Sequence, residues 1–340
     1  MLKNMIQKIR FILITILVFP SQNFSQVDLN KTAQSTMNFL LVGTSSRASA
    51  LGEAFNAIGS GSESMFYNPS GLTDINKNFD ISLNYTSWIA DIKYLSGGAA
   101  WNLGNYGVVG FNILTVDYGD IYGTSLLSPE EANLYPSGFK DNGILNNVGA
   151  YSFGLAYAKA ISEAFSVGGN VKLVGQNLGE SNFGTSSQKN NALKLAVDAG
   201  VKYKTEFNGF TFGMSIRNFS TNIKREEIEE QLPLLFSLGA AINLMETVDK
   251  GLAENNSILL AVDFLHPNNY SERVNLGLEY QYLQMISVRF GYQTNRDLAS
   301  WSGGLGFNTS ISDYDIGISY SYSKFDFFDS VSRISLNFIF

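Results

Sequence analysis

The chain has 340 residues, with 23 Lys and Arg against 30 Asp and Glu, a formal net charge of −7 and no cysteine. The absence of cysteine excludes disulfides, thiolate metal sites and a thiol-linked lipid anchor. The acidic balance argues against a nucleic-acid partner, because phosphate binding requires clustered Lys and Arg. Charged residues make up 16% of the chain and Tyr and Phe number 42, a composition that fits a soluble β-protein or an outer-membrane barrel.

Residues 1–26 predict a secretory signal peptide. Lys3, Lys8 and Arg10 precede the apolar run 11–19, and polar residues follow it. This order is typical of a signal peptide. The alternative, a membrane anchor, is disfavoured because a spanning helix needs roughly 20 apolar residues. We expect cleavage near Gln26, which leaves 20 basic and 30 acidic residues in the exported chain.

Residues 27–78 differ from the rest of the chain and predict a plug segment. Their alanine-rich part indicates a short helix with a serine cap before Arg47. Farther along, Asn68, Pro69, Ser70 and Gly71 predict a tight turn, because Pro fixes φ and Gly allows positive φ. The apolar face of the expected helix comprises Ala50, Leu51, Ala54, Phe55 and Ala57.

From about residue 79 to residue 340, apolar and polar residues alternate with a period of two. In residues 274–282 every even position is apolar or aromatic and every odd position is polar or Gly. This period indicates strands with one apolar and one polar face. The runs last about 9–11 residues, the length that a tilted strand needs to cross a membrane. Aromatic residues near strand ends fit the girdles of a membrane barrel rather than a soluble sandwich.

The runs and breaks together predict an all-β fold, a transmembrane antiparallel β-barrel of about fourteen strands. Short connections alternate with long ones, so both chain ends are expected on the periplasmic side. Residues 246–255 are an exception, since a short turn is expected there. The predicted strands are 79–88, 92–103, 106–117, 147–160, 164–177, 190–205, 208–219, 231–245, 256–265, 271–282, 285–294, 299–308, 314–323 and 328–340.

The last predicted strand carries a candidate barrel-assembly signal. Ile334, Leu336, Phe338 and Phe340 alternate with mostly polar residues, and the sequence stops on an aromatic ring. This pattern is similar to the C-terminal signature that the outer-membrane barrel assembly machinery recognises. We therefore expect that machinery and the outer-membrane lipid to be partners of the chain.

Several short motifs resemble one known family. Residues 39–40, 46–54 and 67–72 resemble the opening of the PorV/PorQ family, a branch of the fourteen-stranded FadL-like barrels, and 84–92 extend the likeness into the first hairpin. The family usually has Ala where this chain has Ser70. The resemblance covers about residues 35–120 most strongly. It implies a bacterial outer-membrane protein, with either a partner role in type IX secretion or the passage of hydrophobic molecules.

Enzymatic and metal-binding functions find little support. His266 is the single histidine and lies in a predicted loop without the neighbours that a catalytic triad requires. No Cys/His cluster or Asp-rich loop indicates a metal site. The acidic run 226–230 is interpreted as a solvated outer loop, and no cofactor is predicted.

The alternation places a set of charges inside the predicted barrel. Buried charges of this kind normally pair with one another, because an unpaired buried charge is costly. Arg47 is the expected partner of one inward carboxylate, and the plug or gating candidates are Arg47, Asn68, Pro69 and Gly71. The predicted lumen network comprises Lys172, Lys194, Asp198, Lys202, Arg217, Asp263, Glu279 and Arg289.

Two functions of different class fit these features. The first is a structural component that binds type IX secretion components or substrates through the outer loops 118–146 and 178–190. The second is a FadL-like passive transporter of small hydrophobic molecules. The inward faces carry mostly Gly, Ser, Asn and charges, which favours the interaction role.

Overall fold

The computed structural model describes residues 35–131, 133–145, 148–183, 186–205, 209–225, 228–248, 255–295, 301–325 and 328–340. The predicted signal peptide, the expected turn at 206–207 and the acidic pair at 226–227 lie outside these residues. In the described part of the chain, no helix has the length and apolar character needed to cross a membrane.

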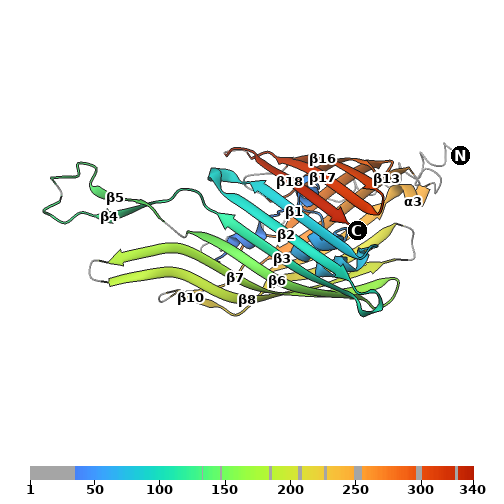
Figure 1. The fold of residues 1–340 in the computed structure, drawn as a ribbon, viewed down its shortest axis with the longest axis horizontal. Helices are drawn as coiled ribbons and strands as arrows, with labels where there is room; N and C mark the ends of the chain where they lie inside the picture. Colours follow the sequence, from blue (N-terminus) through green and yellow to red (C-terminus); the bar gives the residue numbers. More distant parts are fainter. Residues whose placement is uncertain are drawn as a thin grey trace.

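Within the described residues, fourteen antiparallel strands form a closed barrel, which confirms the predicted fold class (Figure 1). Each strand pairs with its neighbours in chain order, and β1 pairs with β18 to close the barrel, with Tyr85 opposite Ile334. The barrel strands are β1 (Phe79–Ser87), β2 (Lys93–Asn102), β3 (Val108–Asp117), β6 (Gly149–Ala160), β7 (Phe165–Phe183), β8 (Ser186–Lys204), β9 (Phe210–Phe219), β12 (Leu235–Asn243), β13 (Asn256–Pro267), β14 (Arg273–Tyr282), β15 (Ile286–Gln293), β16 (Trp301–Ile311), β17 (Tyr314–Ser323) and β18 (Val331–Ile339).

The alternation in the sequence separates the two faces of the wall. On β14, Leu276, Leu278 and Tyr280 point outward and are exposed, whereas Asn275 and Glu279 point inward and are buried. An apolar outer face suits contact with lipid, and small or polar inner residues leave room for chain inside the lumen. The near-zero mean hydropathy of the sequence follows from averaging these two faces.

The two mouths of the barrel differ in the length of their connections. Among the described residues, four short turns lie at the short-turn mouth: 103–107 with η6 (Gly104–Tyr106), 161–164, 283–285 and 312–313. The exceptional β12–β13 connection, at the same mouth, contains α3 (Leu244–Val248). The long-loop mouth carries the hairpins β4 (Tyr122–Leu126)–β5 (Phe139–Ile144) and β10 (Ile223–Arg225)–β11 (Ile228–Glu230), and η5 (Ile89–Asp91) between β1 and β2. Figure 1 shows β4–β5 projecting away from the end where α3 and the C-terminus lie.

The predicted outer loop 178–190 is wrong, because β7 and β8 continue through most of it as a two-stranded ribbon. Pairing shifts in register between Asn177 and Glu180 and then runs to the pair Phe183 and Ser186. The ribbon extends past the neighbouring strand β6, whose last partner on β7 is Asn177. A ribbon beyond the barrel wall has no lipid-facing side, so its sequence lacks the apolar alternation that marks the other strands.

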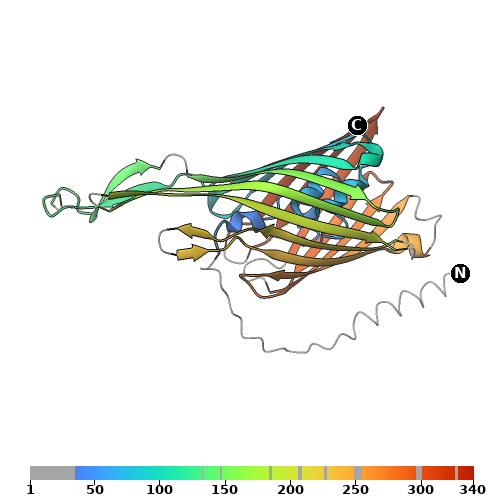
Figure 2. The same cartoon turned by 90° about the horizontal axis from the view of Figure 1, so that it is seen from below.

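Residues 35–78, which we call the lumen segment, run through the barrel from one mouth to the other. They contain η2 (Asn38–Leu41), α2 (Ser46–Ala50), η3 (Gly61–Phe66) and η4 (Pro69–Asp74). Figure 2 shows this segment, in blue, enclosed by the strands, with its first residues at the end where the β10–β11 hairpin projects.

The helix expected over residues 47–57 is shorter than predicted. Ser45 caps α2 by accepting a hydrogen bond from the Ala48 amide, and the helix ends at Ala50. Gly52 and Glu53 both adopt positive φ, which stops the helix. A Cβ atom on Gly52 would lie 2.8 Å from the backbone nitrogen of Tyr292, so the chain can pass this close to the wall only as glycine.

Candidate functional site: the filled lumen

Arg47 joins the lumen segment to the wall through a buried ion triad. Its Nη2 lies 2.8 Å from Oε1 of Glu279 on β14, and its Nε donates to Oε2 at 3.0 Å. Arg289 on β15 donates its Nε to the same Oε2 at 2.5 Å. One carboxylate therefore bridges two guanidinium groups, and the triad keeps a net charge of +1. A buried triad of this kind fixes geometry strongly, because removing the shared partner leaves uncompensated charge.

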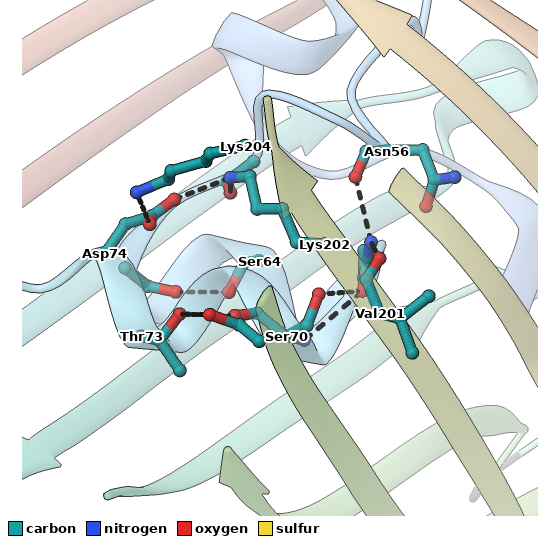
Figure 3. Close-up of polar contacts among 12 residues, drawn as sticks. Asn56, Ser64, Ser70, Thr73, Asp74, Val201, Lys202 and Lys204 are labelled. Carbon is teal, nitrogen blue, oxygen red and sulfur yellow. Dashed lines mark hydrogen bonds and ion pairs between the residues drawn. The ribbon is translucent and has the colours of Figure 1, made fainter. Parts of the chain in front are cut away.

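Asp74 at the end of η4 anchors the segment near the short-turn mouth (Figure 3). Its Oδ2 lies 2.5 Å from Nζ of Lys202 and its Oδ1 lies 2.6 Å from Nζ of Lys204, both on β8. Lys202 also donates to the carbonyl of Gly59 at 2.9 Å. Burial alone would raise the pKa of Asp74, but the adjacent Lys202 ammonium, together with Lys204, holds that pKa below its ordinary value.

Asn68 is the hydrogen-bonding centre of the predicted turn and caps η4. Its Nδ2 donates to the carbonyls of Asn56 at 2.9 Å and Val201 at 3.1 Å, while its Oδ1 accepts from the Ser70 hydroxyl at 2.6 Å. Where this turn lies against the barrel wall, the wall residue is a glycine. A Cβ on Gly200 would come within 2.0 Å of Oδ1 of Asn68.

Pro69 and Gly71 complete this close fit. A Cβ on Gly168 of β7 would lie 2.5 Å from the carbonyl carbon of Pro69, and one on Gly71 would lie 2.3 Å from the carbonyl oxygen of Gly59. The turn thus contacts both the wall and a second loop of the segment without space for an added side chain.

A second ion pair lies where the wall is irregular. Nζ of Lys172 on β7 lies 2.8 Å from Oδ2 of Asp198 on β8 and donates to Asn218 at 2.6 Å. Asn218 has a positive φ of 64° and marks a register shift between β8 and β9. Its amide donates to Oδ1 of Asp198 at 2.7 Å. The pair therefore satisfies the backbone that the bulge would otherwise leave unpaired.

Asp263 and Arg217 bind backbone groups of the lumen segment instead of each other. Oδ2 of Asp263 accepts from the amides of Phe55 at 2.9 Å and Asn56 at 2.8 Å. Arg217 donates to the carbonyl of Phe66 at 2.5 Å and lies over the Tyr67 ring at 5.5 Å. Lys194 lies apart from all these groups. Its Nζ donates to Thr221 at an exposed position at the long-loop mouth.

An apolar cluster closes the lumen at the long-loop mouth. Met37 and Phe39 of the lumen segment are 2% and 4% exposed there. Wall residues from several strands and from the β10–β11 region surround them. The other buried members of this outer-mouth cluster are Tyr94, Leu114, Val116, Ala150, Val174, Ala196, Ile223 and Leu232.

Two spaces of different size lie below this cluster. The inner one is a vestibule of about 650 Å³ at the short-turn mouth, lined largely by amide, hydroxyl and charged groups. Glu63 lines this vestibule and accepts a hydrogen bond from the Ser45 hydroxyl at 3.0 Å.

The outer space is a chamber of about 70 Å³ in the half of the lumen nearer the long-loop mouth. Around it, the Tyr67 hydroxyl, Oδ1 of Asp263 and both amide atoms of Asn275 are buried without a hydrogen-bond partner among the described residues. The chamber therefore has a mixed lining, in which these polar groups lie among apolar side chains.

Several residues that hold the lumen segment were not predicted from the sequence. Arg333 on β18 donates to the carbonyl of Gly43 at 2.8 Å and lies over the Trp88 ring at 5.4 Å. The alternation of β18 points Arg333 inward, so the signal was present in the pattern. Asp74 and Asn56 gave no such signal, because their positions depend on the path of the segment.

The terminal strand lies at the closing seam of the barrel. Ile334, Leu336 and Phe338 of β18 pair with residues of β1 and β17, in the alternation described above. Phe340 stacks on Phe79 with ring centroids 5.3 Å apart, and the two residues exchange backbone hydrogen bonds.

A closed wall with an apolar outer face, short turns at one mouth and long hairpins at the other defines an outer-membrane β-barrel, here with chain filling its lumen. The chain belongs to the family of the type IX secretion system membrane protein PorP/SprF, whose family model matches residues 140–332. This model does not name PorV/PorQ, and the part of the chain that resembles PorV/PorQ lies mainly before residue 140. No curated protein matches the chain.

Solved structures share the fold at low sequence identity. The CymD monoaromatic hydrocarbon channel is 12% identical with a TM-score of 0.54, over 88% of this chain and 97% of that one. The toluene transporter TodX of Pseudomonas putida is 12% identical with a TM-score of 0.52, over 87% and 97%. A FadL homologue from Pseudomonas aeruginosa is 11% identical with a TM-score of 0.51, over 87% and 97%. These likenesses establish the architecture alone.

Proposed function

We propose that the chain is a closed structural barrel of type IX secretion, which binds secretion components or substrates at its long-loop mouth. The observation that carries this proposal is the filled lumen. Ion pairs at Glu279 and Asp74 and the outer-mouth cluster hold the lumen segment along the whole barrel. A lumen held in this way suits a docking platform better than a conduit.

The β4–β5 hairpin supplies the docking surface. It projects from the barrel and exposes large apolar side chains, including Leu126 at 93% and Leu134 at 73%. Tyr122, Phe139 and Ile144 of the same hairpin are also exposed. Apolar groups gathered on a projecting element favour burial against a protein partner. Long connections face the outside of the cell in barrels of this class, so the hairpin is available to secreted proteins.

The alternative is passive transport of small hydrophobic molecules, which the FadL-like architecture suggests. The lumen chemistry disfavours it. An apolar molecule entering the small outer chamber would offer no hydrogen-bond partner to the Tyr67 hydroxyl, Oδ1 of Asp263 or the Asn275 amide. Each buried group without a partner costs about 1–3 kcal/mol, more for a charge. These polar groups among the apolar side chains therefore disfavour an apolar occupant.

Shortening the hairpin tests the proposal. Leu126 and Phe139 are paired across β4 and β5. Replacing residues 127–138 with Asn-Gly joins this pair by a two-residue turn, a favoured hairpin connection. In the native host we expect normal amounts of heat-modifiable barrel and a loss of surface display of proteins secreted by the type IX route. Leu126→Ser, which keeps the hairpin length, should weaken display partially.

The opposite pattern would support transport. Normal display in the shortened variant, together with uptake of a monoaromatic hydrocarbon that is lost on deleting the gene, would contradict the docking proposal. As a control, adding Asn-Gly to the 312–313 turn should leave display unchanged, because that turn lies at the other mouth.

The finer parts of the proposal concern biogenesis and subfamily. We infer that residues 1–26 direct export, that residues 27–78 act as a plug and 79–340 as the barrel, and that the alternating terminal strand engages the barrel assembly machinery. A PorV/PorQ-like role within type IX secretion rests on the motifs at 46–54 and 67–72 and stays a prediction.

A further inference from the structure

The lumen segment has a direction, and this direction places its two ends on opposite sides of the membrane. Its last residues lie at the short-turn mouth. Asn78 accepts a hydrogen bond from the Asn102 amide at the end of β2, at 2.8 Å. Lys77 forms an ion pair of 2.7 Å with Asp315 beside the β16–β17 turn.

Its first described residues lie at the long-loop mouth. Ser35 bridges to Gln231 between β11 and β12, and the Thr36 amide donates to the Gln231 carbonyl at 3.0 Å. Nδ2 of Asn269, in the β13–β14 connection, donates to the Ser35 hydroxyl at 2.7 Å. Met37 and Phe39 then enter the outer-mouth cluster.

Between these ends the segment crosses the lumen along a path that turns back more than once. Ser62 meets Asp80 near the start of β1 at the short-turn mouth, Phe66 then packs against the outer-mouth cluster, and Asp74 meets Lys202 near the end of β8. The segment nevertheless enters the barrel by one mouth and leaves it by the other.

We infer that the exported chain is threaded through its own barrel, so that the lumen segment begins at the outer surface, with Ser35 beside the β10–β11 hairpin, rather than on the periplasmic side expected from the connections. The start of the lumen segment then becomes part of the face that carries the β4–β5 hairpin and binds secreted partners. The assignment of this mouth to the cell exterior rests on the proposed function.

The cysteine-free sequence permits a direct test with single-cysteine variants. Lys31→Cys and Ser35→Cys report on the start of the exported chain. Ser137→Cys in the β4–β5 connection and Asn105→Cys in the β2–β3 turn are exposed markers for the two mouths. Intact cells are treated with a membrane-impermeant maleimide, and mass spectrometry of the purified barrel gives the first residue of the exported chain.

We expect Lys31→Cys and Ser137→Cys to be labelled to the same extent on intact cells, and Ser35→Cys to be labelled partially because its side chain is half-buried. Asn105→Cys should be labelled after lysis and not before. Labelling of Ser137→Cys with protection of both Lys31→Cys and Ser35→Cys would overturn the threading and leave the docking face in place. Labelling of Asn105→Cys on intact cells with protection of Ser137→Cys would overturn the assignment of the long-loop mouth to the cell exterior. In that case the start of the lumen segment would face the periplasm, so threading would require Lys31→Cys to be protected as well.

Discussion

Replacing Glu279 with Gln should release the lumen segment while leaving the barrel assembled. The substitution keeps the size of the side chain and removes the charge that Arg47 and Arg289 share at 2.8 and 2.5 Å. Two guanidinium groups are then left close together without a carboxylate between them. Arg47→Ala is the milder change, because Glu279 keeps Arg289 as its partner.

The expected magnitudes follow from these geometries. Removing one partner of a buried pair costs about 3–5 kcal/mol, so Glu279→Gln should raise the undocked fraction of the segment by roughly two to four orders of magnitude. Arg47→Ala should cost about 1.5–3 kcal/mol, the value of hydrogen bonds to a charged group. Asp315→Asn is the control, since its pair with Lys77 is about a third exposed and such pairs contribute about 0–1 kcal/mol.

Conductance in planar bilayers measures this effect. The wild type and Asp315→Asn should be nearly closed, Arg47→Ala should open occasionally and Glu279→Gln should open often. Trypsin cleavage after Arg47 of the lumen segment provides a second readout for the wild type, Asp315→Asn and Glu279→Gln, since its rate follows the undocked population when redocking is fast. A freely conducting wild type, or a Glu279→Gln variant as closed as Asp315→Asn, would refute the idea that the triad holds the segment in place.

Three other predictions concern assembly, close packing and pH. Changing Phe338 and Phe340 to Ser should lower the amount of heat-modifiable barrel while export continues; an unchanged amount in outer-membrane fractions would argue against the assembly signal. Gly71→Ala should raise conductance, because its Cβ would lie 2.3 Å from a backbone carbonyl of the neighbouring loop; unchanged conductance would mean that the loop shifts to admit it. At pH values above the ordinary pKa of Asp74, its ionised carboxylate stabilises the docked lumen segment. This stabilisation is lost as the pH falls through the lowered pKa that Asp74 has in the docked state. Wild-type conductance should therefore rise at pH values below about 4. The conductance of Asp74→Asn should already be raised at neutral pH and should change little on acidification. A matching acid response in both proteins would exclude the Asp74 carboxylate as its source.

The barrel could be predicted because one physical rule acts on nearly every strand. Lipid outside and packed chain inside require alternation, and β14 and β15 show it over their full length. The rule fails where the chain leaves the membrane. The β7–β8 ribbon, α3 and the β4–β5 and β10–β11 hairpins lie in stretches that carry no alternation, so the sequence indicated connections there without their structure.

The inward orientation of the lumen side chains could be predicted from the sequence, but their binding partners could not. Alternation points Glu279 and Asp198 inward, yet it does not state that Glu279 meets Arg47 or that Asp198 meets Lys172. Those contacts depend on the path of residues 35–78, which local positive φ at Gly52 and Glu53 redirects. The apolar side chains expected on one face of a single helix instead lie on several turns, which pack against different parts of the barrel wall.

The path of the lumen segment also constrains the order of folding. Closing the wall requires β1 to pair with β18, which brings together Ile81 and Phe338 from nearly opposite ends of the described chain. If this seam formed first, the amino-terminal end would have to be drawn through a lumen already lined by close contacts. If the open sheet instead curls around residues 35–78, those residues act as a template for the barrel, and the β1–β18 seam forms last. Pairing so distant in sequence is intrinsically slow, which leaves time for the segment to settle against the sheet. An early β1–β18 seam would enclose an empty lumen. The filled lumen therefore implies that the seam forms after the lumen segment has settled against the sheet.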